Sequence, residues 1–153
     1  MTTSITSELP RDERLGRREL FPYWSKESVR WSDTDRVGHV NNVAYAVYCE
    51  SGRTAFLTPL TLGKPGVRTL LLLAQINLSF RGESDWPAIV DIGTVVLDIG
   101  QSSCRIGHGL YVGERCVATA DSLLVHIDET TRRPRELPDS ARAYLSRHGL
   151  VAA

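Results

Sequence analysis

The alternation of hydrophobic and polar residues changes several times along the first half of the chain. From Glu27 to Asp33 apolar and polar residues alternate, and this period of two predicts a half-buried strand. From Val40 to about Leu57 apolar residues occupy nearly every face of a helical projection, which predicts a long buried helix. We expect a loop to follow, because the next residues include the breakers Pro59, Gly63, Pro65 and Gly66.

The second half of the chain has the pattern of an antiparallel sheet. Four β-rich runs predict strands over residues 69–81, 88–98, 103–112 and 115–128. Short turns at Gly100 and Gly113 separate the last three runs, so consecutive strands should be antiparallel neighbours. A short terminal helix is predicted over residues 138–148. One long helix and about five strands predict an α+β fold in which one curved antiparallel sheet wraps the helix.

The domain organisation predicted from these patterns is simple. Residues 1–20 mix Ser, Thr and charges without a steady apolar period, so we expect a partly flexible N-terminal arm, and residues 21–153 should form a single domain. One long helix leaves a face of a five-stranded sheet poorly covered, and long apolar edge strands favour pairing with another chain. A symmetric homodimer, or a tetramer built from two such dimers, is therefore expected.

Composition excludes several classes of protein. The 153 residues carry 18 Lys plus Arg against 18 Asp plus Glu, which argues against a general binder of nucleic acid or of membrane surfaces. The longest apolar run, Leu70 to Ala74, is far shorter than the ~20 residues that a membrane-spanning helix needs. Three cysteines without paired spacing indicate reduced thiols, so the chain should be cytoplasmic and contain no zinc site.

Arginine dominates the basic residues, because only Lys26 and Lys64 among the 18 are lysines. Guanidinium groups bind phosphates and carboxylates through two parallel hydrogen bonds. Genome composition explains the same bias equally well, so the count alone assigns no ligand.

The densest cluster of polar residues lies between the first predicted strand and the long helix, from Asp33 to Arg53. A helix N-terminus offers unpaired N–H groups and a positive dipole end that can polarise a carbonyl. A carboxylate beside it can act as a base or as a nucleophile. Structural roles explain the same residues: Asp33 or Asp35 as a cap or turn former, His39 as a hydrogen-bonded structural histidine, and Glu50 with Arg53 as a helix ion pair.

This segment matches a known pattern, Asp-Thr-Asp-x-x-Gly-His-Val-Asn-Asn-x-x-Tyr-x-x-Tyr-x-Glu-x-x-Arg, at every fixed position. The pattern resembles the signature of hotdog-fold acyl-CoA thioesterases of the 4-hydroxybenzoyl-CoA thioesterase type. The resemblance extends over about residues 25–147 and includes the turn at 99–103, the small residues 116–120 and the Arg- and Pro-rich stretch 128–138. It implies a long central helix wrapped by a curved antiparallel sheet and paired into dimers, which agrees with the fold expected from the hydrophobic pattern.

The resemblance also implies roles for individual residues. Asp35 matches the catalytic carboxylate, and the backbone N–H of Asn42 falls where the family polarises the thioester carbonyl. The remaining matched residues should line or position the pocket: Asp33, Gly38, His39, Asn41, Tyr45 and Glu50. Such a reaction uses no metal and no cofactor, because a thioester is already an activated acyl group and CoA is part of the substrate.

A basic stretch near the C-terminus is the candidate for contacts with CoA. By resemblance, Ser103, Arg133 and Arg135 bind the nucleotide end of CoA, often at the site of the neighbouring subunit. A solvated turn that binds nothing explains these charges as well. The chain departs from the family pattern at residues 82–88, where Trp86 makes the turn bulkier, so the acyl preference of relatives does not transfer.

The function expected from the sequence is hydrolysis of an acyl-CoA thioester. Alternatives are an acyl-carrier-protein thioesterase and a non-catalytic acyl-CoA-binding protein; retention of Asp35 with the helix start disfavours the second. Hydratases of the same fold need a different spacing of Asp and His from that of Asp35 and His39. The acyl group, and the choice between nucleophilic attack and water activation by Asp35, stay open.

Overall fold

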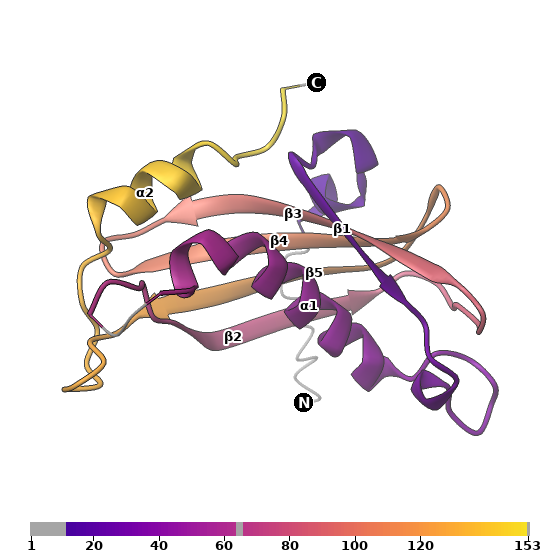
Figure 1. Cartoon of the computed structure of the whole chain (residues 1–153). Helices are drawn as coiled ribbons and strands as arrows, with labels where there is room; N and C mark the ends of the chain where they lie inside the picture. Colours follow the sequence, from indigo (N-terminus) through magenta and orange to yellow (C-terminus); the bar gives the residue numbers. More distant parts are fainter. Residues whose placement is uncertain (1–11, 64–65, 153) are drawn as a thin grey trace, which may run out of the picture.

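The computed structural model describes residues 12–63 and 66–152. In these residues it contains five antiparallel strands, two α-helices and three short 3₁₀ helices. The strands form one sheet in the order β1-β3-β4-β5-β2, so β1 and β2 are its edges. Their bounds are Tyr23–Ser28 (β1), Leu71–Phe80 (β2), Ile89–Ile99 (β3), Ser103–Val112 (β4) and Arg115–His126 (β5). The helices are Asn42–Thr61 (α1) and Asp139–Ser146 (α2), as Figure 1 shows. The predicted hotdog fold is confirmed.

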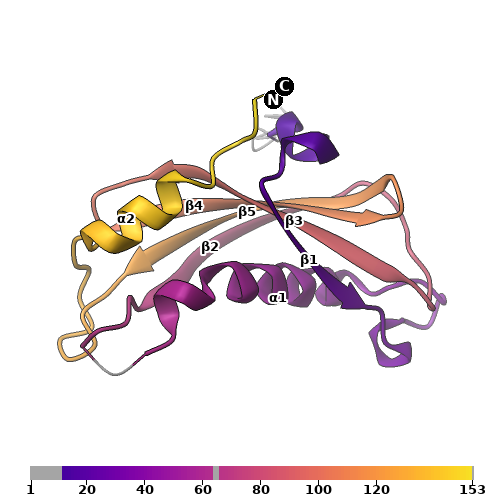
Figure 2. The same ribbon diagram turned by 45° about the horizontal axis from the view of Figure 1, so that its top comes forward.

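Helix α1 lies in the hollow of the curved sheet (Figure 2). Tyr48 and Phe56 on its inner side are fully buried and pack with the inward residues of β3, β4 and β5. The prediction that Pro59 lies in a loop was wrong, because α1 continues through Pro59 to Thr61. Proline removes one hydrogen bond from a helix. The last turn forms nevertheless, because it buries Leu60 in the core.

The first strand begins and ends earlier than predicted. Residues Tyr23 to Ser28 pair with β3, whereas Trp31–Asp33 form a short 3₁₀ helix, η3. The alternation seen in the sequence therefore continued past the end of the strand. The chain turns there because the Asp33 carboxylate accepts the Arg30 N–H at 2.9 Å, and Trp31 is left 71% exposed.

The face of the sheet opposite α1 is covered by the described part of the N-terminal arm. Residues Glu13–Gly16 and Arg18–Leu20 form two 3₁₀ turns, η1 and η2, and Leu15 and Phe21 pack against that face. Gly93 of β3 permits this approach, because a Cβ atom there would lie 2.5 Å from Cγ of Phe21. Residues 1–11 of the predicted arm lie outside the described residues.

Helix α2 lies beside the second half of β3, past Thr94, where β1 no longer pairs with β3 (Figure 1). The Val96 N–H donates to the carbonyl of His148, just after α2, at 2.8 Å. The Tyr144 hydroxyl donates to the carbonyl of Phe56 in α1 at 2.6 Å. The predicted terminal helix is confirmed, and it fastens the C-terminal half of α1 to the sheet.

Strand β2 is an edge strand with an unusual number of exposed apolar side chains. Leu72, Leu73 and Phe80 are between 38% and 48% exposed. Val43 and Val47 of α1 are exposed as well. Within the part of the chain that the structure describes, neither helix has the length and apolar character that crossing a membrane requires.

Candidate functional site

A tight loop between η3 and α1 presents Asp35. A bridge between Thr34 and Val40 closes the loop, the Asp35 N–H donates to the His39 carbonyl at 2.9 Å, and the Gly38 N–H donates to the Asp35 carbonyl at 3.0 Å. Gly38 has a φ of 93°, a conformation that other residues rarely adopt. The predicted pocket residue Gly38 therefore shapes the loop through its backbone.

Asn41 caps helix α1. Its side-chain oxygen accepts the Val43 N–H at 3.1 Å, and its own N–H donates to the Asp33 carbonyl at 2.8 Å. Asn42 is the first helical residue, and its N–H has no acceptor among residues 12–63 and 66–152. The helix start therefore carries a free N–H donor at the predicted position, with the positive end of the helix dipole behind it.

Asp35 and Asn42 lie on the wall of one pocket of about 430 Å³. Asp35 Oδ1 accepts the Val37 N–H at 2.9 Å, whereas Oδ2 has no partner within the described ranges. Asp35 thus forms a turn through Oδ1, as the structural alternative predicted. The prediction that Asp35 caps α1 was wrong, because Asn41 is the cap. The pocket is lined by Asp35, Val37, His39, Val40, Asn42, Tyr45, Phe80, Gly82 and Glu83.

Asp33 has a different environment from Asp35. It is buried, and its Oδ2 accepts the Tyr48 hydroxyl at 2.7 Å and the Arg30 N–H at 2.9 Å. Burial raises the pKa of this carboxyl, but the hydrogen bonds from Arg30 and Tyr48 outweigh it and hold the pKa below its usual value. These contacts tie η3 to α1, and the positioning role of Asp33 stays a prediction.

His39 is held by acidic residues of the loop between β2 and β3. Its Nδ1 lies 2.7 Å from Asp85 Oδ1, and its Nε2 lies 3.3 Å from Glu83 Oε2. The hydrogen bond with Asp85 raises the pKa of His39 above its usual value. Residues Glu83 and Asp85 were missed in the sequence, although the unusual loop at 82–88 marked the segment that contains them.

Tyr45 joins the same loop to α1. Its buried hydroxyl lies 2.8 Å from Ser84 Oγ, and the Ser84 carbonyl accepts the Val40 N–H. Trp86 of this loop packs edge to face on Trp31, with ring centroids 5.2 Å apart. Trp86 is absent from the pocket lining, so within one chain its side chain does not border the pocket.

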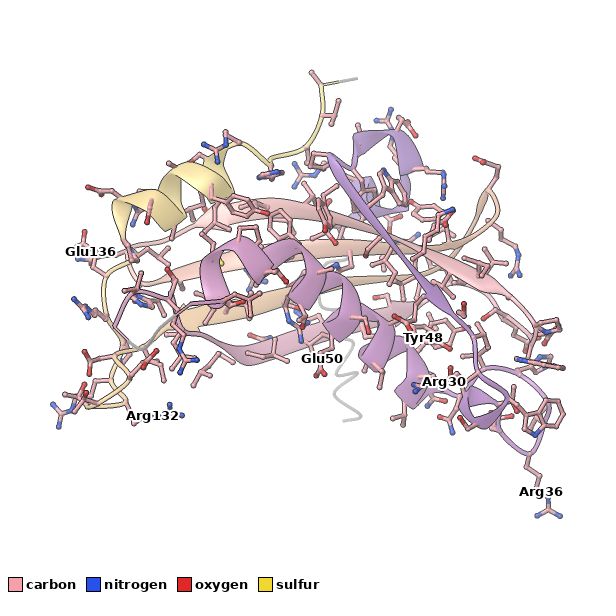
Figure 3. The ribbon with its side chains drawn as sticks, in the orientation of Figure 1. Arg30, Arg36, Tyr48, Glu50, Arg132 and Glu136 are labelled. Atoms are coloured by element: carbon pink, nitrogen blue, oxygen red, sulfur yellow. The ribbon has the colours of Figure 1, made fainter. Side chains whose placement is uncertain are left out.

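The candidate CoA-binding residues gather at the opposite end of the sheet. The Leu137 N–H donates to the Gln101 carbonyl, and the His126 N–H donates to the Ser102 carbonyl, so the stretch with Arg133 and Arg135 lies against the turn that precedes Ser103. In Figure 3 the labelled Arg132 lies at one end of the molecule and Arg36, in the Asp35 loop, at the other. Within one chain, these arginines therefore cannot reach the pocket.

Glu50 lies on the exposed side of α1 and is labelled in Figure 3. It does not line the pocket of its own chain. The alternative reading of Glu50 and Arg53 as an ion pair was wrong, because Arg53 is buried and the two side chains form no salt bridge in the described structure. The side chain predicted to position substrate therefore faces outward.

The chemistry of the pocket follows from its two free groups. The two residues that carry them, Asp35 and Asn42, line the same pocket. An N–H donor can hold a carbonyl oxygen, and a carboxylate can act as a base or nucleophile at the carbonyl carbon. Among the described residues no group of three or more His, Cys, Asp or Glu side chains could hold a metal ion. Acyl-transfer chemistry at an activated carbonyl suits this donor set.

Comparison with solved structures shows the class of fold to which the chain belongs. The chain superimposes on the PA5185 protein of Pseudomonas aeruginosa with a TM-score of 0.79, at 24% identity over 89% of this chain and 97% of that one. It also resembles a thioesterase of Thermus thermophilus solved with coenzyme A and Zn, with a TM-score of 0.73, at 24% identity over 82% and 98%. The fold is therefore one that thioesterases use.

The family follows from the sequence match. The model of the thioesterase-like superfamily matches residues 29–145, and the chain belongs to this superfamily. The uncharacterized protein YsmA of Bacillus subtilis is 35% identical over 55 residues, which are 36% of this chain and 37% of YsmA. That match thus spans little more than a third of the curated relative.

Proposed function

We propose that the protein is an acyl-CoA thioesterase that hydrolyses an acyl-CoA to a free acid and CoA. The observation that carries the proposal is that one pocket is lined both by Asp35, whose Oδ2 is free in the described structure, and by Asn42, whose backbone N–H is free there. The matched signature from Asp33 to Arg53 and the thioesterase-like family support the same reaction.

In the proposed reaction the thioester carbonyl oxygen accepts the Asn42 N–H. Asp35 either removes a proton from a water that attacks the carbon, or attacks it directly to form an anhydride that water then hydrolyses. In both routes a C–O bond forms, the C–S bond breaks and the thiolate of CoA takes up a proton. Losing one such oxyanion donor costs about 3 kcal/mol of transition-state stabilisation in other enzymes. The reaction needs no metal or cofactor.

The proposal includes a two-fold dimer formed along β2. An exposed apolar edge strand favours pairing with a second copy, and an isologous pair of β2 strands runs antiparallel. Full-length pairing then brings the Phe80 end of one β2 beside the Leu71 end of the other. Phe80 lines the Asp35 pocket, so each pocket would meet the opposite end of the partner subunit.

In this dimer the basic stretch with Arg133 and Arg135 would lie beside the partner's Asp35 pocket. Leu71 pairs with His126, and the Ile127 N–H donates to the Leu70 carbonyl, so the residues after β5 lie at the Leu71 end of β2. Arg133 and Arg135 are exposed there. We propose that they bind the phosphates of a CoA held in the partner's pocket, together with Ser103 at the start of β4.

The first test is the Asp35→Asn variant. We expect kcat to fall by about a hundredfold to ten-thousandfold, because an amide can act neither as base nor as nucleophile. A thiol-release assay over short, long and aromatic acyl-CoAs measures it, with circular dichroism to check folding. Asp98→Asn, an exposed carboxylate on β3, is the matched control and should keep full activity.

Two results would contradict the proposal. Full activity in Asp35→Asn would remove Asp35 from the mechanism. Hydrolysis of acyl-carrier-protein thioesters, with no turnover of any acyl-CoA, would assign the carrier protein as the substrate.

The second test concerns the CoA phosphates. In Arg133→Ala and Arg135→Ala we expect KM for CoA esters to rise about tenfold, and KM for thioesters of truncated pantetheine to stay constant, because only CoA carries the nucleotide phosphates. Arg17→Ala, at an exposed position in the N-terminal arm, is the control. An equal rise for both substrates would remove the phosphate role.

A further inference from the structure

A second cavity, of about 220 Å³, lies between α1 and β2. Its walls are five leucines, Thr54, Thr61 and Arg53; three of the leucines are the consecutive Leu71, Leu72 and Leu73 of β2. The walls are thus apolar except for two hydroxyl groups and one guanidinium. Such a lining fits a methylene chain with a polar end.

Arg53 is the unusual member of this cavity. Only 7% of the residue is exposed, and its one side-chain hydrogen bond within the described residues is a long one, 3.4 Å from Nη1 to Ser122 Oγ. A guanidinium has five N–H donors, stays charged in proteins, and is costly to bury without an anion. Its other guanidinium nitrogens have no partner in the described residues and are not fully buried, so a ligand in the cavity can reach them.

Within the described residues, no acidic side chain of the surrounding core neutralises Arg53. Burial lowers the pKa of Arg53 and also lowers that of the nearby His108 to about 3, so this histidine is neutral. His108 is fully buried, and its Nε2 has no partner in the described structure. Glu50, one helical turn before Arg53, raises the pKa of Arg53 through charge attraction, but it is exposed and forms no salt bridge with Arg53 in the described structure. Within the described residues, the guanidinium therefore has no anion in direct contact.

The cavity lies far from the Asp35 pocket of its own chain but close to that of a partner. The Asp35 pocket contains Phe80, at the end of β2, whereas this cavity contains Leu71 to Leu73, at its beginning. Antiparallel two-fold pairing of β2 brings these two ends together across the interface. An acyl group held at one subunit's Asp35 would then extend toward the other subunit's Arg53.

We propose that this cavity binds the far end of the acyl group whose thioester lies at the partner's Asp35, and that Arg53 binds a carboxylate at that end. The inference rests on the proposed function and defines its substrate class as CoA thioesters of dicarboxylic acids. The leucines hold the methylene chain, and the guanidinium fork forms two parallel hydrogen bonds with the terminal carboxylate.

The test compares matched substrates. Kinetics are measured with succinyl-, adipoyl-, suberoyl- and sebacoyl-CoA and with monocarboxylic acyl-CoAs of equal chain length. At the best chain length we expect kcat/KM for the dicarboxylic substrate to exceed that of its partner by about tenfold to a hundredfold, because a hydrogen bond to a charged group contributes about 1.5–3 kcal/mol. Arg53→Met should abolish the preference, and the surface variant Arg17→Gln should keep it.

Because Arg53 is buried, its replacement can also disturb folding, and Thr54→Glu gives an independent test. Thr54 is exposed on α1 and lines the cavity, so a glutamate there offers Arg53 a carboxylate of the chain itself. We expect the dicarboxylic preference to disappear, measured as the ratio of kcat/KM for each dicarboxylic substrate to kcat/KM for its monocarboxylic partner in the same variant. Thr54→Gln, of equal size and without charge, should retain the preference.

The outcomes separate the inference from the function on which it rests. No turnover of any acyl-CoA would remove the proposed function itself. Turnover of monocarboxylic substrates at rates equal to or above those of their dicarboxylic partners, at every chain length, would overturn the Arg53 inference and leave the thioesterase standing. A wild-type enzyme that is active as a monomer, by light scattering at assay concentration, would also overturn it.

Discussion

The buried polar groups at the N-terminal end of helix α1 are hydrogen-bonded differently from the buried arginine in its second half. At the N-terminal end the buried Asp33 accepts hydrogen bonds from Arg30 and Tyr48, and Asn41 caps the helix. Toward the C-terminal end the buried Arg53 has one long hydrogen bond and no anion among the described residues. Buried polar groups in native proteins are nearly always paired, so an exception calls for an explanation.

The difference distinguishes groups that build the fold from groups kept for a ligand. Asp33 and Asp35 are only two residues apart, yet the first has its oxygens committed to the chain and the second keeps Oδ2 free. By the same criterion, the free N–H of Asn42 and the guanidinium of Arg53 are available to a ligand. The comparison can be tested by replacing members of each kind.

The largest expected effect is on stability in Asp33→Ala. We expect the free energy of unfolding to fall by about 3 kcal/mol, because the Tyr48 hydroxyl and the Arg30 N–H would lose their acceptor. Urea denaturation measures it. Asp35→Ala, which removes one hydrogen bond to a partly exposed carboxylate, should cost less than about 1 kcal/mol. Equal losses in the two variants would contradict the distinction.

The same carboxylate gives a pH dependence whose sign is fixed. The pKa of Asp33 is lowered in the folded state, so its contribution is present above the usual value of 3.8 and is lost as the pH falls through the folded-state pKa. The stability difference between the wild type and Asp33→Asn should therefore shrink in acid. A difference that grew below pH 3.8 would contradict the assignment.

A smaller effect is expected at the helix cap. Asn41→Ala should lower the free energy of unfolding by about 1 kcal/mol, because the Val43 N–H would lose its side-chain acceptor. Thermal and urea denaturation measure it. Asn42→Ala is the matched control next to it and should stay within about 0.5 kcal/mol, since the exposed Asn42 side chain forms no hydrogen bond in the described structure.

The smallest effect is a shift in titration without loss of fold. In Asp85→Asn we expect the pKa of His39 to fall toward its usual value, because the hydrogen bond with Asp85 is the main cause of its rise. NMR titration of the imidazole measures it. Glu83→Gln should produce a smaller shift in the same direction. An unchanged pKa in Asp85→Asn would mean that Asp85 does not hold the imidazole.

The sequence was sufficient for the long helix, for four of the five strands and for the helix start at Asn42. Those elements have strong local signals: an apolar helix, alternating runs separated by glycine turns, and a dense polar motif. It was insufficient at Trp31–Asp33, where a side-chain hydrogen bond ends the strand, and at Pro59, where burial of Leu60 outweighs the local preference of proline. Both errors arise where a contact overrides a propensity.

The same division applies to the candidate site. The resemblance of the motif to the thioesterase signature indicated Asp35, Asn41 and Asn42, which lie close together in the chain around one loop and one helix start. The pairing of His39 with Asp85, and the burial of Arg53 beside Ser122, join residues far apart in sequence, so no local pattern could predict them.

By itself, the sequence determined the class of fold and the segment that we propose to carry the chemistry, because hydrophobic periodicity and a contiguous motif are local properties. The tertiary structure decided which polar groups are paired and which stay free. In the folded chain Asp33 is hydrogen-bonded to Tyr48, whereas Asp35 keeps Oδ2 free in the described structure. The arginines after β5 lie at the end of the sheet opposite the Asp35 pocket, and Arg53 is buried without a salt bridge among the described residues. Pairing depends on distance in space, and only the folded chain defines that distance.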